Sequence, residues 1–328
     1  MSRAKLNSDY LRWTNLPKLA AVAILCTGCF ATRSMAQQPG QKTFASAEDA
    51  SNALVMAAQN NDEKAMIAIL GPDAQRIVSS GDDAEDTTDR ATFVMKYQQM
   101  HRFVQEPDGT TTLYIGAENW PTPIPLVNVA DAWYFDTAAG KREILYRRVG
   151  ENELSAIRVC QELVAAEKEY YSSQQNVYAE KIFSDEGQHD GLYWKAAPGE
   201  PQSPIGPLVA AAVVEGYAKN QNGAPTPYHG YYFRVLTRQG PDSPGGAKSF
   251  IVDGKMTGGF AFEAYPASYR SSGVMTFIVG EDGVVYEKDF GGDTADLARA
   301  VREYNPSSGW RKDEDQQQSA AGGQNANQ

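Results

Sequence analysis

Apolar and polar residues alternate most regularly in the last third of the chain, where the pattern is typical of β-strands. Four segments rich in β-branched and aromatic residues are predicted to be strands: residues 231–236, 260–265, 274–279 and 284–289. The last two are joined by Gly280-Glu281-Asp282-Gly283, a turn of residue types that tolerate positive φ. The pattern therefore predicts a four-stranded antiparallel meander with aromatic residues on at least one face.

An amphipathic helix is predicted before this meander. Apolar side chains recur at helical spacing over residues 153–173, at Ile157, Cys160, Val164 and Tyr171. A loop-rich stretch, residues 185–206, and a short helix at residues 208–217 are expected next. After the last strand, Asp293 or Thr294 can cap a further short helix.

The first half of the chain has the pattern of helices followed by strands. Ser46 and Asp62 can cap two helices, and Gly71-Pro72 ends the second. A third helix is predicted over residues 88–103. Strands are then predicted at residues 111–117, 126–129, 132–136 and 143–148. The proline-rich segment 120–125 cannot join a central strand because each proline removes a ladder donor, so we expect an edge or a rim there.

The length of 328 residues and a hydrophobic content of 42% suit two ordinary domains. We predict an α+β domain over residues 44–150 and a second α+β domain over residues 151–312. Residues 37–43 are interpreted as a polar spacer. Residues 313–328, rich in Gln, Ala, Gly and Asn, lack side chains that could form a core and are predicted to be disordered.

The first 36 residues have the features of an export signal. Basic residues precede an apolar run at residues 19–26, and Ser34-Met35-Ala36 places small residues at the −3 and −1 cleavage positions. The run is too short to span a bilayer. A competing site at Cys29 is similar to a bacterial lipoprotein box. The sequence thus predicts a periplasmic protein cleaved after Ala36, with a lipid anchor at Cys29 as the alternative, and no transmembrane span in the mature chain.

The charge of the chain argues against a nucleic-acid partner. The formal net charge is −11. Without residues 1–36 the chain holds 25 Lys and Arg and 40 Asp and Glu, a net charge of −15. Binding to phosphates requires a basic surface, which an acidic chain does not supply.

No motif for catalysis is present. The sequence lacks a phosphate loop, a dinucleotide fingerprint, a His-Glu-x-x-His zinc motif and a nucleophile elbow. Three scattered histidines and one cysteine beyond the signal, Cys160, give no zinc-ligand spacing. Cys160 is interpreted as a small buried apolar residue. No cofactor is predicted, and the protein is interpreted as non-catalytic.

The order of elements in residues 44–150 resembles the NTF2-like α+β fold, in which a curved antiparallel sheet follows helices. Members of that fold often hold a small ligand or an acid–base pair in the cone. The resemblance implies that Tyr97, His101 and Trp133 could line a ligand pocket, together with Trp120 and Asp82-Asp83. The alternative is that these aromatic residues belong to the core and that the aspartates form a solvated turn.

Residues 153–290 are similar to the globular domain of type IV pilins and pseudopilins, because one helix, a loop and a four-stranded meander follow one another. The polymerising N-terminal helix of pilins is replaced here by a whole polar domain. The resemblance implies weak calcium candidates at Asp282, Asp289 and Asp293, although their spacing is not that of a calcium loop. Exposed aromatic residues of the sheet, Tyr228 and Tyr232, are candidates for binding a glycan or a peptide.

Four segments, 71–73, 119–125, 135–140 and 231–236, carry a resemblance of residues 44–312 to a bacterial family of unknown function, number 2950. This resemblance implies an exported protein with no assigned activity. We interpret the chain as a non-catalytic binding or assembly module of the cell envelope, with envelope proteins or glycans as partners. The alternative is a small-ligand-binding protein or enzyme that uses a cavity in the N-terminal domain.

Overall fold

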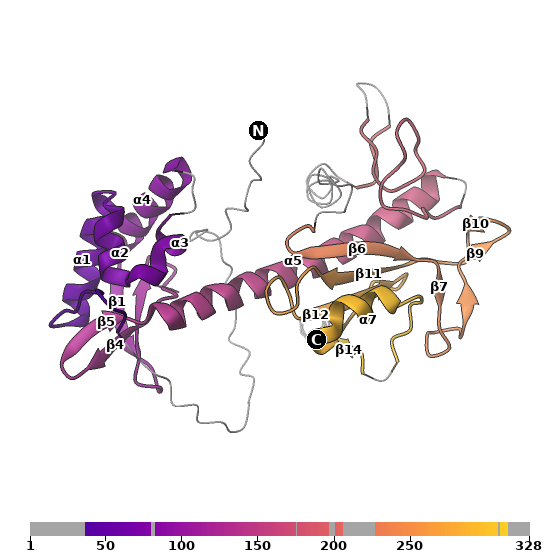
Figure 1. Ribbon diagram of the computed structural model, residues 1–328. Helices are drawn as coiled ribbons and strands as arrows, with labels where there is room; N and C mark the ends of the chain where they lie inside the picture. The colour runs from indigo at the N-terminus through magenta and orange to yellow at the C-terminus, as the bar shows by residue number, and fades with distance from the viewer. Residues whose placement is uncertain are drawn as a thin grey trace, which may run out of the picture. The chain divides into compact units, whose positions relative to one another are not determined.

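The computed structural model describes residues 37–79, 83–174, 176–196, 201–205, 227–307 and 309–313. The chain divides into two compact units, Met1–Arg147 and Arg148–Gln328, which are described separately below. Helices and antiparallel sheets make up both units, so the predicted α+β class is confirmed (Figure 1). The predicted signal, Cys29, Asp82, the helix at residues 208–217 and the tail beyond Asp313 lie outside the described residues.

The first unit begins with helices. These are α1 (Ala47–Gln59), α2 (Glu63–Leu70), the 3-10 helix η1 (Pro72–Ala74), α3 (Gln75–Val78) and α4 (Asp83–Gln99). The predicted caps are present: Ser46 Oγ accepts from Asp49 N at 3.0 Å, and Asp62 Oδ1 accepts from Ala65 N at 2.9 Å. Gly71 ends α2 at φ 93°, a value that suits glycine.

An antiparallel sheet follows these helices. Its strands are β1 (His101–Gln105), β2 (Thr111–Ile115), β3 (Trp120–Pro121), β4 (Leu126–Val129) and β5 (Ala132–Phe135). The order is β1-β2-β4-β5, and β3 pairs with β2 at the start of the proline-rich segment. Apolar residues of α1, α2 and α4 pack on Leu113, Ile115 and Leu126 of the sheet to form one core. Gln41 links α2 to β5, since its buried Nε2 donates to Leu70 O at 3.0 Å and to Phe135 O at 2.8 Å.

Two predictions for this region are wrong. The predicted helix 88–103 ends at Gln99, and His101 begins β1 because residues 101–105 pair with residues 115–111 of β2. The predicted strand 143–148 is helical, since it lies within α5 (Thr137–Ser173). Tertiary packing outweighs local β-propensity there, because Ile144 packs on the core of the first unit.

Helix α5 is 37 residues long and begins well before the predicted start at residue 153. Asp136 caps it, because Asp136 Oδ1 accepts a hydrogen bond from Ala139 N at 2.9 Å. Gly140 lies in the first turn of α5. A Cβ at this position would lie 2.6 Å from Ile124 Cγ1, so glycine is required for close packing. No helix among the described residues is long and apolar enough to cross a membrane.

The second unit contains the predicted meander. Its strands are β6 (Tyr231–Leu236), β11 (Ala261–Pro266), β12 (Met275–Gly280) and β13 (Val285–Asp289), with β14 (Arg311–Lys312) at the edge. The order β14-β13-β12-β11-β6 with antiparallel neighbours confirms the prediction. Two small ribbons lie between β6 and β11 in sequence: β7 (Arg238–Gln239) with β8 (Lys248–Ser249), and β9 (Ile251–Val252) with β10 (Lys255–Met256).

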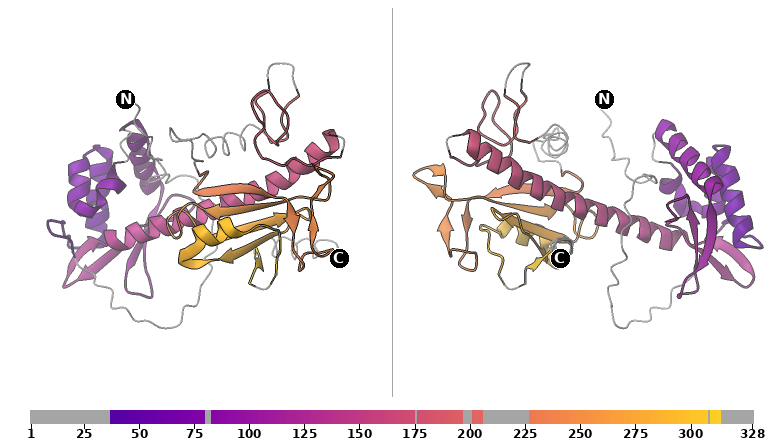
Figure 2. Two further views of the ribbon diagram at one scale, coloured as in Figure 1. Left: turned by 45° about the vertical axis from the view of Figure 1, so that its right-hand side comes forward. Right: turned by 180° about the vertical axis from the view of Figure 1, so that it is seen from behind.

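Helices cover both faces of this sheet. The part of α5 in the second unit lies on one face, and α7 (Thr294–Ala300) lies on the other (Figures 1 and 2). Cys160 and Leu163 of α5 are fully buried against Phe262 and Phe277 of the sheet. The aromatic strand residues are therefore mostly core, which is the role that alternation on a half-buried sheet predicts.

An ion pair between neighbouring strands ties α7 to the sheet. Arg234 of β6 pairs with Glu263 of β11, which is fully buried. Arg234 Nη2 also donates to the carbonyl oxygens of Ala298 and Val301, each at 2.6 Å, at the C-terminus of α7. Burial raises the pKa of Glu263 to about 7, although the Arg234 guanidinium lowers it.

A second buried carboxyl lies on α5. Glu167 is fully buried, and its Oε2 accepts a hydrogen bond from Ala179 N at 2.9 Å. Burial raises the pKa of this carboxyl to about 8, while the Ala179 hydrogen bond lowers it. Glu167 therefore favours the protonated form in the folded state at neutral pH.

The pKa of Glu167 makes stability depend on pH in a defined direction. From the ordinary value of 4.5 up to about 8, the folded state holds this proton more tightly than the unfolded state, so stability falls as pH rises through that window. Glu263 adds to the fall up to about pH 7. We expect Glu167→Gln to leave the free energy of unfolding at pH 5 nearly unchanged. At pH 9 it should raise this free energy by a few kcal/mol, since each pKa unit corresponds to about 1.4 kcal/mol.

Urea titrations at several pH values measure this effect. Glu169→Gln is the matched control, because Glu169 is exposed on the same helix. A pH profile of Glu167→Gln that overlies the profile of the unchanged protein would contradict the prediction.

Candidate functional site

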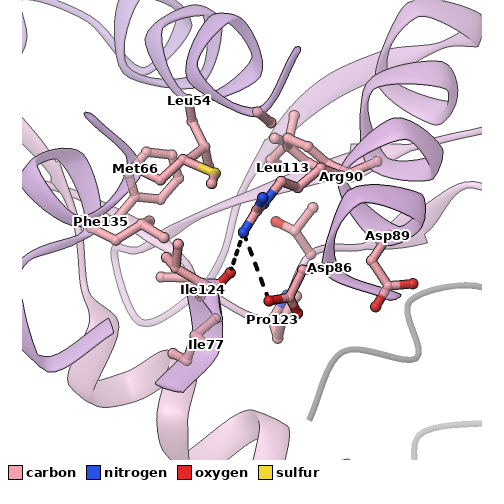
Figure 3. Close-up of a pocket in the computed structure, with 15 residues that line it drawn as sticks. Leu54, Met66, Ile77, Asp86, Asp89, Arg90, Leu113, Pro123, Ile124 and Phe135 are labelled. Carbon is pink, nitrogen blue, oxygen red and sulfur yellow. Dashed lines mark hydrogen bonds and ion pairs between the residues drawn. The ribbon is translucent and has the colours of Figure 1, made fainter. Parts of the chain in front are cut away.

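A small cavity lies inside the first unit, between its helices and its sheet. Its volume is about 60 Å³. Most of the lining is apolar and comes from Leu54, Ala58, Met66, Leu70, Ile77, Val78, Phe93, Leu113, Pro123, Ile124 and Phe135. Four polar or charged residues complete it: Asp86, Asp89, Arg90 and Thr122. Figure 3 shows the Arg90 side chain extending toward the apolar residues, with Asp86 and Asp89 to one side.

Arg90 is the central polar residue of this cavity. Only 11% of its side chain is exposed. Its Nη2 lies 2.8 Å from Glu63 Oε1, at the start of α2, and donates to Val78 O at 3.0 Å, at the end of α3. The same nitrogen lies 3.9 Å from Oδ2 of the buried Asp86, one turn earlier on α4. A single guanidinium thus joins three helices and is itself neutralised by carboxylates.

Among the residues that line the cavity, Arg90 and Thr122 each have a buried polar atom with no hydrogen-bond partner in the described part of the chain: Arg90 Nε and Thr122 Oγ1. Thr122 is only 8% exposed, so water does not reach it as it would reach a surface hydroxyl. A buried donor or acceptor without a partner costs about 1–3 kcal/mol, and such groups often mark a place where a ligand or an ordered water binds.

The proline-rich segment explains how Thr122 is held. Pro121 and Pro123 flank it and have no backbone N–H, so Thr122 N is the donor that fixes this part of the chain. It donates to Leu113 O at 2.8 Å. Ile124, two residues after Thr122, is buried and lines the same cavity. The segment predicted to be a rim therefore forms one wall of the cavity.

Sequence reasoning did not identify Arg90 and Thr122 as site residues. One signal was available, because Asp86, Arg90, Phe93 and Tyr97 fall at the spacing of a single helical face. An acidic and a basic residue one helical turn apart, on the same face as apolar residues, predict a buried ion pair. Thr122 is a polar residue between prolines, and only the tertiary structure shows that its hydroxyl is buried.

Tyr97 and His101 contact each other, and neither lines the cavity. Their rings stack with centroids 4.0 Å apart, and His101 Nδ1 lies 3.1 Å from Tyr97 O. The buried Tyr97 hydroxyl lies 3.0 Å from Ser51 Oγ and 3.0 Å from Asn52 Oδ1, and burial raises its pKa. Trp133 is half-buried in β5 and packs on the core. None of these three residues lines the cavity described above, and their role in binding a ligand stays a prediction.

The predicted ligand-binding tyrosines lie in the second unit. Tyr228 is half-buried and its ring contacts His229 edge-on, with centroids 4.2 Å apart. Tyr232 is half-buried on β6 and its ring lies 5.4 Å from that of Tyr265 on β11. Their role in binding a glycan or a peptide stays a prediction.

Two of the three calcium candidates accept hydrogen bonds from the backbone, and Asp293 makes no side-chain capping hydrogen bond. Asp282 Oδ1 accepts from Val284 N at 3.1 Å in the turn, and Asp289 Oδ1 accepts from Gly291 N at 2.7 Å. Asp293 is the N-cap residue of α7. Across the described residues, no group of three or more His, Cys, Asp or Glu side chains is placed to hold a metal ion.

The cavity has few polar residues. Its polar residues are an arginine, two aspartates and a threonine, and Asp86 is engaged by Arg90. The one described cysteine, Cys160, lies in the core of the second unit, where burial raises the pKa of its thiol to about 12. A thiol with that pKa is not a nucleophile at neutral pH.

The fold and the cavity define an α+β protein of two units with a small, mostly apolar site in the first. Residues 41–312 match the family described as a protein of unknown function (DUF2950), and the chain belongs to this family. The resemblance predicted from the sequence is thereby confirmed. No curated protein and no solved structure matches the chain. The NTF2-like and pilin-like resemblances are not confirmed by these comparisons and stay predictions.

The buried hydroxyl of Thr122 yields a prediction about stability. Thr122→Val keeps the shape of the side chain and its backbone hydrogen bond but removes an atom without a partner. We expect the free energy of unfolding to rise by about 1 kcal/mol, because an unsatisfied buried hydroxyl is costly. Thr137→Val is the matched control. Thr137 is also buried and its hydroxyl donates to Leu70 O, so its loss should lower the free energy of unfolding.

Chemical denaturation of both variants measures the two changes. If Thr122→Val destabilises the protein as much as Thr137→Val does, the Thr122 hydroxyl has a partner in solution and the assignment is wrong.

Proposed function

We propose that the protein is a non-catalytic binding protein of the bacterial cell envelope that holds a small molecule in the cavity of its first unit. The observation that supports this is the cavity itself, whose lining is mostly apolar, with Asp86, Asp89, Arg90 and Thr122 as its polar residues. Small-molecule sites commonly have this composition, with many apolar side chains and few placed polar groups.

Catalysis by the same cavity is the alternative, and the contacts favour binding. A general base has to reach the proton that it removes, and a nucleophile has to be activated by a neighbouring base. Asp86 is paired with Arg90, and Thr122 Oγ1 has no base within hydrogen-bond distance among the described residues. Binding of an envelope protein or a glycan through Tyr228 and Tyr232 is a separate prediction for the second unit.

Location in the envelope rests on the sequence. The basic, apolar and small-residue regions of residues 1–36 support export with cleavage after Ala36. A lipid on Cys29 is the alternative, and it would anchor the chain to a membrane.

The two processing routes give different products. We expect the protein isolated from a bacterial envelope fraction to begin at Gln37, because Ser34 and Ala36 are the small residues that signal peptidase requires. Intact-mass spectrometry and N-terminal sequencing measure this. A chain that begins at Cys29 and carries a diacylglyceryl mass would instead establish the anchored form, and an intact Met1 in the cytoplasm would refute export.

Filling the cavity should prevent binding. Ala58 is buried and lines the cavity, so Ala58→Leu places additional carbon atoms there. We expect protein purified from its envelope to carry a small-molecule mass in native mass spectrometry and Ala58→Leu to lack it. Met56→Leu is the control, since Met56 is 58% exposed on the same helix.

The melting temperature of each variant shows whether the fold survives, because overpacking a core can cost about 1–3 kcal/mol. Ala58→Val is a smaller filling residue for the case in which Ala58→Leu does not fold. An absent adduct in the unchanged protein, together with a raised melting temperature of Ala58→Leu, would identify the cavity as a packing defect and end the proposal.

A further inference from the structure

The sheet of the first unit has an open edge at β1. This strand pairs with β2 over its whole length and with no other strand in the described part of the chain. The opposite edge, at β5, is paired further: Phe44 N donates to Trp133 O at 2.8 Å, and Trp133 N donates to Phe44 O at 2.9 Å. A strand edge with unpaired N–H and C=O groups is a template for pairing with a further strand.

The hydrogen bonds just outside β1 fix which residues bond to β2. Before the strand, Met100 O accepts from Gly116 N at 3.0 Å, and after it Glu106 N donates to Thr110 O at 2.8 Å. Along an antiparallel pair, residues whose backbone bonds to the neighbour alternate with residues whose backbone points away from it. The even-numbered residues of this segment therefore bond to β2.

The odd-numbered residues of β1 have backbone groups that point out of the sheet edge. These are His101, Phe103 and Gln105, which make no backbone hydrogen bond with another described residue. His101 and Gln105 are exposed and Phe103 is half-buried. Three N–H donors and three C=O acceptors are thus available along one edge.

Strand β1 lacks the features that usually protect a sheet edge. It contains no proline and no lysine, and its register with β2 runs without a bulge. Its two basic side chains are held over the sheet and the helices. Arg102 Nε donates to Asn119 Oδ1 at 2.7 Å and its guanidinium lies 4.4 Å from the centre of the Tyr114 ring, while the His101 ring stacks on Tyr97.

The sequence of β1 is complementary to itself. If two copies pair antiparallel about a two-fold axis at Phe103, the outward groups of His101 meet those of Gln105 in the second copy. Arg102 then lies opposite Val104 of the second copy, so no like charges face each other directly. This register uses every outward N–H and C=O group of the strand. A register centred on Arg102 would place two guanidinium groups opposite each other, which is unfavourable.

We propose that the first unit pairs with a second copy of the protein through β1, antiparallel and with Phe103 opposite Phe103, so that two sheets join into one. An extended segment of another protein would use the same backbone groups, but the complementary register favours a second copy. This inference does not depend on the proposed function. The strand has five residues and is about 17 Å long, so we expect a dimer that forms at micromolar or higher concentration.

A proline at Gln105 tests the interface. Gln105→Pro removes an outward N–H and adds a ring at the edge, and it leaves the hydrogen bonds to β2 in place. We expect it to weaken the dimer at least about tenfold in sedimentation velocity over a concentration series of the purified protein. Gln105→Thr is the matched control, because it changes the same exposed side chain and keeps the N–H. It should form the dimer as the unchanged protein does.

Two charged variants test the register. Val104→Glu would face Arg102 of the second copy with an opposite charge, and Val104→Lys would face it with a like charge. We expect the Val104→Glu dimer to be at least about fivefold tighter than the Val104→Lys dimer. In a register centred on residue 104, each variant would face its own charge and both dimers would weaken, which would overturn the proposed pairing.

Hydrogen exchange of the unchanged protein gives a measurement that no variant has to survive. The amides of Phe103 and Gln105 should exchange more slowly as the protein concentration rises, because they become hydrogen-bonded across the interface. A protein that stays monomeric up to roughly 1 mM, with exchange of these amides independent of concentration, would overturn the proposal. A dimer that Gln105→Pro leaves intact would place the interface elsewhere. Protection of the two amides in a monomer mixed with an envelope extract would assign the edge to another protein instead.

Discussion

Each unit depends on one kind of interaction, in which a buried or half-buried arginine caps the C-terminus of a short helix. Arg90 donates to Val78 O at the end of α3, and Arg234 donates to Ala298 O and Val301 O at the end of α7. These helices have four and seven residues, too few to be stable in isolation. The terminal carbonyls carry a partial negative charge, so a guanidinium both satisfies and neutralises them.

The same two arginines compensate buried carboxylates, and this couples local helix ends to the core. Arg234 pairs with the fully buried Glu263, whereas Arg90 contacts Glu63 at 2.8 Å and the buried Asp86 at 3.9 Å. Removing one partner of such a pair leaves an uncompensated charge, which is more costly than the pair is stabilising. The ion pairs therefore specify which elements meet, and the apolar contacts supply most of the stability.

The sequence was informative where local signals agree with tertiary structure. Alternation and the Gly280–Gly283 turn predicted the meander of the second unit, and two side-chain caps predicted the starts of α1 and α2. Prediction from the sequence failed where tertiary packing outweighs the local propensity for helix or strand. The strand predicted at residues 143–148 is part of α5, which Gly140 lets approach Ile124 closely. Strand β1 was missed because it forms by pairing with β2.

The candidate site was predictable only in part, because its defining property is a tertiary one. A cavity in the first unit was the alternative hypothesis from the sequence, with Tyr97, His101 and Trp133 around it. The first two stack on each other, the third packs on the core, and none of the three lines the cavity. Arg90 and Thr122 line the same cavity because helix–sheet contacts bring together segments that are distant in sequence. No local sequence pattern encodes such contacts.

Buried polar atoms without hydrogen-bond partners occur in both units. In the described part of the second unit they include Thr276 Oγ1, the Tyr304 hydroxyl, Glu167 Oε1 and Glu263 Oε1, and burial has raised the pKa of the two carboxyls to about 8 and about 7. Protonation removes the charge of such a group without help from another molecule. Arg90 Nε and Thr122 Oγ1 in the first unit, like the Thr276 and Tyr304 hydroxyls in the second, do not change protonation at neutral pH. A polar atom without a partner therefore does not by itself indicate a ligand, and what distinguishes the first unit is the mostly apolar cavity beside Arg90 and Thr122.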